Sequence, residues 1–504
     1  MGQQLINPDW GLVVPQLIVF VLAMVLLFGD AFLPRERHYT WLTGISLGGY
    51  TIALIALVWQ RGESDSTFYG LFRADGLTVF LSLTILAAAI LTVLTSASYV
   101  DQLEGRMPLG EFYVLLAFSI LGALLTSAAG DLILIFVGIE LSSLSTYILT
   151  AFAKRRATSL EGALKYFLLG LFASAILLYG MAWIYGATGS TNITTIAQVL
   201  EAGVIDDNLN ASLLLGLLLI VVGMGFKMAA VPFHFWTPDA YDGAPTPVTG
   251  FMSVVPKAAA FAATIRLLVQ ALAPLRDDWL TLIAILALIT MTFGNIVAVS
   301  QRNVKRLLAY SSIAHTGYIL VGIAAYQTDT GFTGGGGDQG ISSVLYYLLA
   351  YTFMNIGAFA IVSWLQHRGK GMTLDDFNGL AAHEPLAAAA MAIFMISLMG
   401  IPPTIGFYAK YYVIVAAIDA ELLWLALAIV LMSAVSAFYY LRIVAVMYFG
   451  DSETAPEPRR TRLLDLGIAG MVVGVLLLGL FSSPIIRLAN EWSDALTVAG
   501  ATVP

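Results

Sequence analysis

The sequence predicts an all-α polytopic membrane protein with about fourteen transmembrane helices. Of its 504 residues, 59% are hydrophobic and only 11% are charged, and the mean hydropathy is +0.86. Soluble globular proteins do not reach this combination, so soluble enzyme classes are excluded. Apolar runs of about 20 residues, the length that crosses a bilayer as a helix, follow one another along the chain. Two of these runs are broken by proline and carry a lysine, as in transporters.

The predicted helices cover nearly the whole chain. In order, the apolar runs fall near residues 11–33, 39–59, 76–100, 112–129, 131–153, 160–186, 211–230, 250–273, 279–300, 304–325, 341–366, 386–418, 420–448 and 463–482. The first run is long enough to span a membrane and has no basic residues before it, so we interpret it as a retained helix and not as a signal peptide.

These helices predict one membrane domain, 1–504. Three N-terminal helices lie within 1–100, a first repeat occupies 112–273, a second repeat occupies 279–450, and a C-terminal helix and tail occupy 463–504. The glycine-rich segment from Thr333 to Asp338 is typical of an extramembrane loop.

Helices 7 and 12 are predicted to be broken. The segments 231–238 and 399–410 each contain two prolines, which interrupt helical hydrogen bonding. A broken helix is tolerated at membrane depth where it lines a cavity or packs against protein. Because the two broken helices are five apart and five is odd, helices 4–8 and 9–13 cross the membrane in opposite senses. The sequence therefore predicts two inverted five-helix repeats.

The positions of Lys and Arg predict the orientation. Loops after odd-numbered helices contain most of the basic loop residues, including the cluster at 154–156 and residues 302, 305 and 306. The loops on the other side contain only Arg61, Arg73, Arg276 and Arg487. Since positive loops remain inside, both termini are expected on the outer, periplasmic side.

Several kinds of chemistry are excluded within this chain. It contains no cysteine, which rules out cysteine-bound iron-sulfur clusters, disulfides and thiol catalysis. It also lacks a His-x-x-x-His pair on a helix, a glycine-rich phosphate loop and a calcium-type carboxylate cluster. Nucleic acid is not expected as a partner. Hydride transfer or hydrolysis by this chain alone is not expected.

Glu140 is the most informative single residue. It lies about nine residues into a predicted helix, near the bilayer midplane. Acidic residues at that depth usually belong to a transport or proton-transfer path. The alternative is a protonated carboxyl that is hydrogen-bonded to Ser142, Ser143 or a neighbouring helix.

Three lysines are also predicted to lie within the membrane. Lys227 precedes Pro232 by five residues, at the carbonyl end of a half-helix that attracts cations. Lys257 follows Pro256 inside helix 8, and Lys410 lies in the broken helix 12. Lys227 has the alternative of reaching to the membrane interface, and the other two of capping carbonyls that the breaks leave free.

Two further candidates are less distinct. Lys165 follows Glu161 by four residues, which suits either a surface ion pair or a relay beside Glu140. His315 lies well inside a helix and suits either a proton shuttle or a neutral, packed histidine.

We expect His234 to satisfy backbone groups in the break. Arg266 and Arg442 cannot release a proton and are interpreted as fixed charges; we assign no role to the other histidines.

In combination, these motifs resemble the antiporter-like membrane subunits of respiratory complex I, NADH-quinone oxidoreductase, and among them the N type. The motifs are Gly138-Ile-Glu-Leu-Ser-Ser-Leu-Ser-Thr-Tyr147, Ala163-Leu-Lys-Tyr-Phe-Leu-Leu-Gly170, Phe226-Lys-Met-Ala-Ala-Val-Pro-Phe-His-Phe-Trp-Thr-Pro-Asp239, Gly243-Ala-Pro-Thr-Pro247, Pro256-Lys-Ala-Ala259, Asn303-Val-Lys-Arg-Leu-Leu-Ala-Tyr-Ser-Ser-Ile-Ala-His315 and Gly406-Phe-Tyr-Ala-Lys410. The N type is favoured by Phe-His-Phe-Trp-Thr-Pro-Asp and by Lys410, where the M type is expected to have Glu. The chain also ends at Pro504, without room for the long lateral helix of the L type.

The resemblance implies a proton path without redox cofactors in this chain. Glu140 would pair with Lys227, and protons would pass through Lys257 to Lys410, with Lys165 and His315 as additional members. NADH, FMN, iron-sulfur clusters and quinone would be bound by partner subunits. The expected partners are the neighbouring antiporter-like and small membrane subunits, and the expected location is the bacterial inner membrane.

Two other functions remain open from the sequence. The broken helices would also serve a cation/proton antiporter of the Mrp type that is not coupled to redox chemistry. Alternatively, the chain would be a structural spacer whose lysines only cap broken helices.

Overall fold

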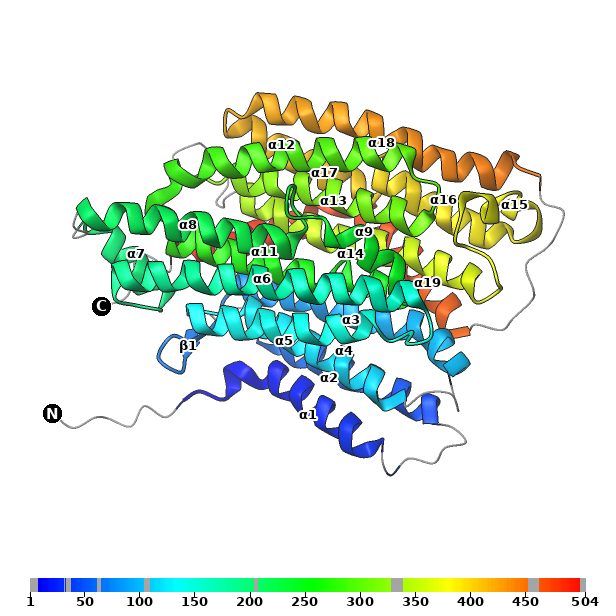
Figure 1. Ribbon diagram of the computed structural model, residues 1–504, viewed down its shortest axis with the longest axis horizontal. Helices are drawn as coiled ribbons and strands as arrows, with labels where there is room; N and C mark the ends of the chain where they lie inside the picture. Colours follow the sequence, from blue (N-terminus) through cyan, green and yellow to red (C-terminus); the bar gives the residue numbers. More distant parts are fainter. Residues whose placement is uncertain are drawn as a thin grey trace.

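A computed structural model describes residues 8–30, 32, 38–60, 65–103, 109–203, 207–327, 339–451 and 462–498. The predicted all-helical membrane fold is confirmed for these residues. Figure 1 shows the helices running side by side, with α1 and α2 along one edge of the bundle and α12 and α18 along the opposite edge. The Thr333 to Asp338 loop prediction lies outside the described residues, as does Arg61.

The N-terminal part contains three long helices and a small hairpin that the sequence did not predict. Its elements are η1 (Gly11–Val13), α1 (Val14–Gly29), α2 (His38–Trp59), β1 (Asp65–Thr67), β2 (Phe72–Ala74) and α3 (Gly76–Leu103). The two strands are antiparallel, with Asp65 opposite Ala74. Strands of three residues are too short to leave a recognisable alternation of polar and apolar residues in the sequence.

The first five-span unit contains the predicted break in helix 7. It consists of α4 (Leu109–Ser127), α5 (Leu132–Thr150), α6 (Ala157–Thr188), the short α7 (Ile193–Glu201), α8 (Asp207–Met228), α9 (Trp236–Gly243), α10 (Thr246–Met252), α11 (Val255–Thr264) and the π-helix η3 (Ile265–Ala271). Helix 7 is divided into α8 and α9, as the prolines predicted.

Helix 8 is divided as well, in addition to the two breaks predicted in helices 7 and 12. Its first part, α10, ends at Met252 and α11 begins at Val255. Pro256 has no N–H to donate to the carbonyl of Met252, so the helix cannot continue undisturbed through this point.

The second unit repeats this plan. It consists of η4 (Ala273–Leu275), α12 (Arg276–Ser300), α13 (Val304–Ala324), α14 (Gln339–Gln366), η5 (Leu374–Phe377), α15 (Leu380–His383), α16 (Pro385–Met399), α17 (Ile405–Asp419) and α18 (Leu423–Phe449). The predicted break in helix 12 separates α16 from α17. The fourth span is therefore interrupted in both units, and in the first unit the fifth span is interrupted as well.

Among the described residues, thirteen helices are long and apolar enough to cross a membrane. The two halves of helix 12 have 15 residues each and are too short to count individually. Taken together they provide one more crossing, which accounts for the predicted total of about fourteen.

The C-terminal region, predicted as a helix and a tail, contains two helices. After α19 (Arg462–Leu480), the chain forms a second helix, α20 (Ser482–Val498). The ring of Trp492 packs edge-on against Phe80 of α3, and Ser493 hydrogen-bonds to Ser342 of α14 at 2.8 Å. The tail therefore ties the N-terminal helices to the second unit.

The centre of the bundle is formed by α10, α11, α13 and α14, which are almost completely buried. Helices α1, α2, α18 and α19 expose large apolar side chains at the periphery. Charged groups on the central helices are thus removed from both the lipid and the water that surround the bundle.

Candidate functional site

Glu140 and Lys227 form a buried ion pair between α5 and α8. Lys227 Nζ lies 2.9 Å from Glu140 Oε1, and the two side chains are 6% and 16% exposed. Ser174 of α6 donates a hydrogen bond to the same carboxylate oxygen at 2.5 Å. The ammonium also contacts Ser143 and Ser174 hydroxyls at 3.0 Å each. Burial at this depth is costly for either charge alone, and the contact between the two opposite charges offsets part of this cost.

The break in helix 7 places Lys227 at this position. Lys227 is the last residue but one of α8, and Ala229 then takes a left-handed conformation with φ of +63°. Trp236 at the start of α9 donates its Nε1–H to the carbonyl of Phe226 at 3.1 Å. The lysine reaches inward to Glu140 and does not extend to an interface.

Tyr147 completes the surroundings of the ammonium group. Its hydroxyl lies 3.5 Å from Lys227 Nζ, and its ring packs edge-on against Tyr166. Gly170 of α6 makes room for it, because a Cβ at this position would lie 2.0 Å from the Tyr147 hydroxyl.

Lys257 is bonded to helix α13. Its Nζ donates to the carbonyl and the hydroxyl of Ser312 at 2.9 and 2.7 Å, and lies 5.6 Å from the centre of the Tyr351 ring. The side chain is buried and has no carboxylate partner within ion-pair distance among the described residues. Its hydrogen-bond partners among the described residues are thus neutral groups, in contrast to the ion pair of Lys227.

Lys410 has a similar environment in the second unit. Its Nζ donates to the carbonyl of Met399, the last residue of α16, at 2.9 Å and lies 5.0 Å from the centre of the Tyr318 ring. Gly400, with φ of +90°, leaves space for the lysine chain, since a Cβ there would approach Lys410 Cδ to 3.0 Å. The lysine thus caps the carbonyl end of a half-helix, a role that does not exclude proton transfer.

His315 lies between these two lysines. It is buried on α13, with Nδ1 2.7 Å from the Tyr347 hydroxyl and Nε2 3.1 Å from the Tyr440 hydroxyl. Ser312, His315 and Tyr318 are three residues apart, so each follows the last at about 4.5 Å along the helix and is turned by about 60° around its axis. These three residues of α13 therefore lead from the partner of Lys257 to the ring beside Lys410.

Lys165 lies outside this buried row. It is 45% exposed and pairs with Glu161 at 2.7 Å and with Asp239 of α9 at 2.8 Å. The ion pair with Glu161 is the i,i+4 pair that the spacing allowed. Arg306 of α13 binds the other oxygen of Asp239 at 2.8 Å. The structure does not bring Lys165 into contact with Glu140.

Two cations counted as loop charges belong to helix α13, which corrects that count. Lys305 and Arg306 follow the first residue of the helix, and Lys305 is buried. The Lys305 ammonium donates to the carbonyls of Asp242 and Ala244 at 2.9 and 2.6 Å, at the end of α9. Sequence reasoning missed this contact because a lysine next to a loop ordinarily faces water.

The two arginines singled out in the sequence bind fixed partners. Arg266 on the π-helix forms a bidentate pair with Asp75, with N–O distances of 2.5 and 2.7 Å. Arg442 donates to the carbonyls of Val299 and Gln301 at the end of α12. His234 is buried in the break, its ring packed against Phe293.

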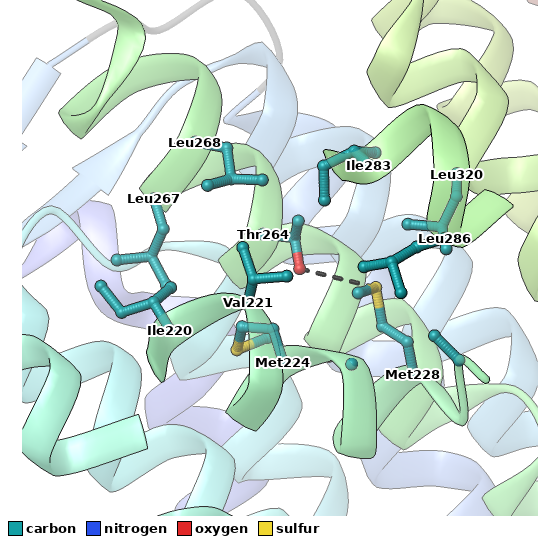
Figure 2. Close-up of a pocket in the computed structure, with 12 residues that line it drawn as sticks. Ile220, Val221, Met224, Met228, Thr264, Leu267, Leu268, Ile283, Leu286 and Leu320 are labelled. Carbon is teal, nitrogen blue, oxygen red and sulfur yellow. Dashed lines mark hydrogen bonds between the residues drawn. The ribbon is translucent and has the colours of Figure 1, made fainter. Parts of the chain in front are cut away.

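A small cavity lies beside the break but apart from the charged groups. It has a volume of about 10 Å³, room for about one water molecule, between α8, α11, η3, α12 and α13. Figure 2 shows Thr264 and Met228 facing each other, with the hydroxyl 3.5 Å from the sulfur. Its other lining residues are apolar, so this cavity is not a polar substrate site.

The arrangement suits proton transfer better than small-molecule chemistry. Glu140, Lys227, Lys257, His315 and Lys410 are ionisable groups on helices of both five-span units, and all five are buried or nearly buried. Within the described residues, no group of three or more His, Asp or Glu side chains is placed to hold a metal ion. Buried groups of this kind can exchange protons when a neighbouring charge moves.

Comparison with known proteins places this arrangement in a family. The family described as "NADH:quinone oxidoreductase/Mrp antiporter, TM" matches residues 129–436. A curated relative, NADH-quinone oxidoreductase subunit N 2 of Roseiflexus castenholzii, is 42% identical over 485 residues, which cover 96% of each chain.

Solved structures share the fold. A chain of respiratory complex I from Thermus thermophilus with bound aureothin is 33% identical, with a TM-score of 0.78, and the match covers 94% of this chain and all of that one. A chain of the Mrp complex from Dietzia sp. matches with a TM-score of 0.83 at 23% identity, covering 97% of this chain and 98% of that one. At that identity the second match indicates a common fold only.

Proposed function

Because the chain belongs to the family of N subunits of NADH-quinone oxidoreductase, we propose that protons cross the membrane through its row of buried ionisable residues. As a member of this family, it is a multi-pass, proton-translocating membrane subunit of respiratory complex I. The observation that supports this path is the Glu140–Lys227 ion pair inside the bundle. The proposal continues the path through Lys257, His315 and Lys410, which are buried as well.

In this proposal the ion pair is the switch. While Glu140 and Lys227 are in contact, the carboxylate stabilises the ammonium. When the pair opens, Lys227 loses this stabilisation and releases its proton towards Lys257. The proton then passes along α13 by way of His315 to Lys410, which controls release on the outer side. Lys165, which is paired with Asp239 in the first turn of α9, acts at the surface and not among the buried groups.

Redox chemistry is proposed to take place in other subunits. The chain has no cysteine, so cysteine-bound iron-sulfur clusters belong elsewhere in the complex. NADH, FMN and quinone are likewise assigned to partner subunits. Reduction of quinone would bias the ion pair through a chain of electrostatic contacts in the neighbouring antiporter-like and small membrane subunits.

The proposed location is the bacterial inner membrane, with both termini on the periplasmic side, as the distribution of basic loop residues indicates. The first repeat, 112–273, then contains Glu140, Lys227 and Lys257. The second, 279–450, contains His315 and Lys410. Each broken helix supplies one lysine to a half-path.

The direct test is replacement of Lys227 or Glu140 with Ala in the assembled complex. We expect proton translocation per NADH oxidised to fall while the complex still assembles, because the switch is lost. Proton uptake by proteoliposomes and NADH oxidation are measured in parallel. Lys154→Ala is the control, since Lys154 is 60% exposed and 3.9 Å from Glu111. Full translocation in either variant of the pair would rule out the assigned path.

A second prediction concerns a substitution that changes no charge. Gly170→Ala places a methyl group where the Tyr147 hydroxyl lies, and so displaces that hydroxyl from Lys227. We expect translocation to fall severalfold. Gly186→Ala on the same helix meets nothing within 4 Å and is expected to behave like the unchanged protein. Equal activity of the two variants in the same proteoliposome assay would mean that the position of Tyr147 is unimportant.

An Mrp-type antiporter uncoupled from redox chemistry is the alternative that the shared fold permits. Sodium-dependent proton exchange by the purified chain without other subunits would favour it. The higher identity to N subunits supports the coupled function.

A further inference from the structure

His315 is held by hydroxyl groups on both ring nitrogens. The imidazole belongs to α13, the Tyr347 hydroxyl to α14 and the Tyr440 hydroxyl to α18. All three side chains are completely or almost completely buried. The Tyr440 hydroxyl is also hydrogen-bonded to Ser311, one turn before His315 on α13.

The partners of Tyr347 determine the direction of its hydrogen bond. Among the described residues, Nδ1 of His315 is the only hydrogen-bond partner of the Tyr347 hydroxyl. A buried O–H that found no acceptor would be costly, so Tyr347 donates to Nδ1. Nδ1 of the neutral ring is therefore unprotonated and accepts.

The positions of the other protons in this chain of hydrogen bonds follow from the unprotonated Nδ1. A neutral imidazole with a bare Nδ1 carries its proton on Nε2, which donates to the Tyr440 oxygen. The Tyr440 O–H is then free to donate to the Ser311 oxygen. The reverse order would leave the Tyr347 proton without an acceptor. Every donor in the chain from Tyr347 to Ser311 thus points the same way.

This chain lies where the proposed path needs a carrier. Lys257 is bonded to Ser312, which is three residues before His315, and Lys410 lies over the ring of Tyr318, three residues after it. Tyr347 provides the hydroxyl that faces the basic nitrogen of His315 at 2.7 Å.

We propose that Tyr347 is the group through which His315 takes up and releases a proton, and that Tyr440 and Ser311 are positioning residues that fix its tautomer. This inference rests on the proposed function. A proton that arrives from the Lys257 side binds the Tyr347 oxygen as the original Tyr347 proton moves to Nδ1, which gives an imidazolium. In the return step the Nδ1 proton goes back to the Tyr347 oxygen and the other proton of that oxygen leaves towards Lys410. One proton enters and one leaves, and the ring regains its first tautomer.

The test compares two adjacent tyrosines in the assembled complex. Tyr347→Phe removes only the hydroxyl at Nδ1. Tyr346→Phe removes an equally buried hydroxyl, whose partner is the carbonyl of Leu478 at 3.3 Å. We expect protons translocated per NADH oxidised to fall in Tyr347→Phe to the level of a Lys257→Ala complex, and to remain unchanged in Tyr346→Phe.

The positioning role of Tyr440 and Ser311 is tested with two variants of Ser311. Ser311→Ala removes the acceptor of the Tyr440 proton, whereas Ser311→Thr keeps it. We expect the translocation ratio to fall in the first variant and to be restored in the second, which a packing role for Ser311 would not produce.

Two results would overturn the inference alone: an unchanged ratio in Tyr347→Phe while Lys257→Ala is deficient, or equal losses in Tyr347→Phe and Tyr346→Phe. An unchanged ratio in Lys257→Ala would overturn the proposed path itself, and this inference with it.

Discussion

Replacing Asp75 with Ala is expected to destabilise the folded chain by about 3–5 kcal/mol. The carboxylate is paired with Arg266, whose side chain is completely buried. Arg266 also donates to the hydroxyl of Thr78 and the carbonyl of Ser127, at 2.9 and 3.1 Å. Removing the carboxylate leaves the guanidinium without its counter-charge in a site that water does not reach. The measurements are the amount of assembled complex in the membrane and its thermal denaturation in detergent.

Asp277→Ala is the matched control for this loss. Asp277 lies 3.8 Å from Arg276, and its side chain is fully exposed. An exposed pair contributes little, so we expect no measurable change in assembly or thermal denaturation. Similar destabilisation in both variants would contradict a special role for the buried pair.

The stability that the Asp75–Arg266 pair contributes depends on pH. Burial raises the pKa of the Asp75 carboxyl, but Arg266 lowers it by more, so the pKa lies below its ordinary value. A carboxyl with a lowered pKa in the folded state contributes its stability above the unfolded pKa and loses it as the pH falls through the folded value. The contribution of Asp75 is therefore complete at neutral pH and is lost only below about pH 4.

The second large effect concerns the Glu140–Lys227 pair. We expect substitutions there to change the stability of the fold and proton translocation in different ways. Lys227→Met leaves the carboxylate without its cation, and Glu140→Gln leaves the ammonium without its anion, each at a cost of about 3–5 kcal/mol. The double variant removes both charges together. We expect it to be more stable than either single variant, yet still unable to translocate protons through this chain.

Denaturation of the three variants and proton uptake by proteoliposomes test this separation. The interaction energy follows from the double-mutant cycle. Recovery of translocation together with stability would mean that the pair serves only to hold α5 and α8 together.

The broken helices were predictable because proline marks them directly. Helix 7 is divided into α8 and α9 around the segment 231–238, and helix 12 is divided at Pro402 and Pro403. The additional division of helix 8 was missed although Pro256 is visible in the sequence. A single proline near the start of an apolar run is also compatible with an uninterrupted helix, so the pattern did not decide between the two.

The candidate residues were predictable where a charge stands alone in an apolar run. Glu140, Lys227, Lys257 and Lys410 were identified for this reason, and the structure buries all four or nearly so. For Lys165 the sequence allowed two interpretations, a surface ion pair or a relay beside Glu140. Its contacts correspond to the surface pair.

Their partners were not predictable from local pattern. Tyr440 is 125 residues from His315, and Asp75 is 191 residues from Arg266. A tyrosine in an apolar run looks the same whether it fills space or bonds a histidine, and only tertiary packing distinguishes the two. The helix α20 was missed because its mixed polar and apolar sequence is too short and too polar to span.

The contacts of Lys305 and Arg306 have a mechanical consequence. Both residues lie in the first turn of α13, in the second unit, and both bind α9, which belongs to the first. Arg306 pairs with Asp239 in the first turn of α9, and Lys305 donates to the carbonyls of Asp242 and Ala244 at its C-terminal end. At its other end, α9 is bonded through Trp236 to the carbonyl next to Lys227. The short helix is therefore bonded to both units, and it connects the first turn of α13 to the residue that precedes Lys227.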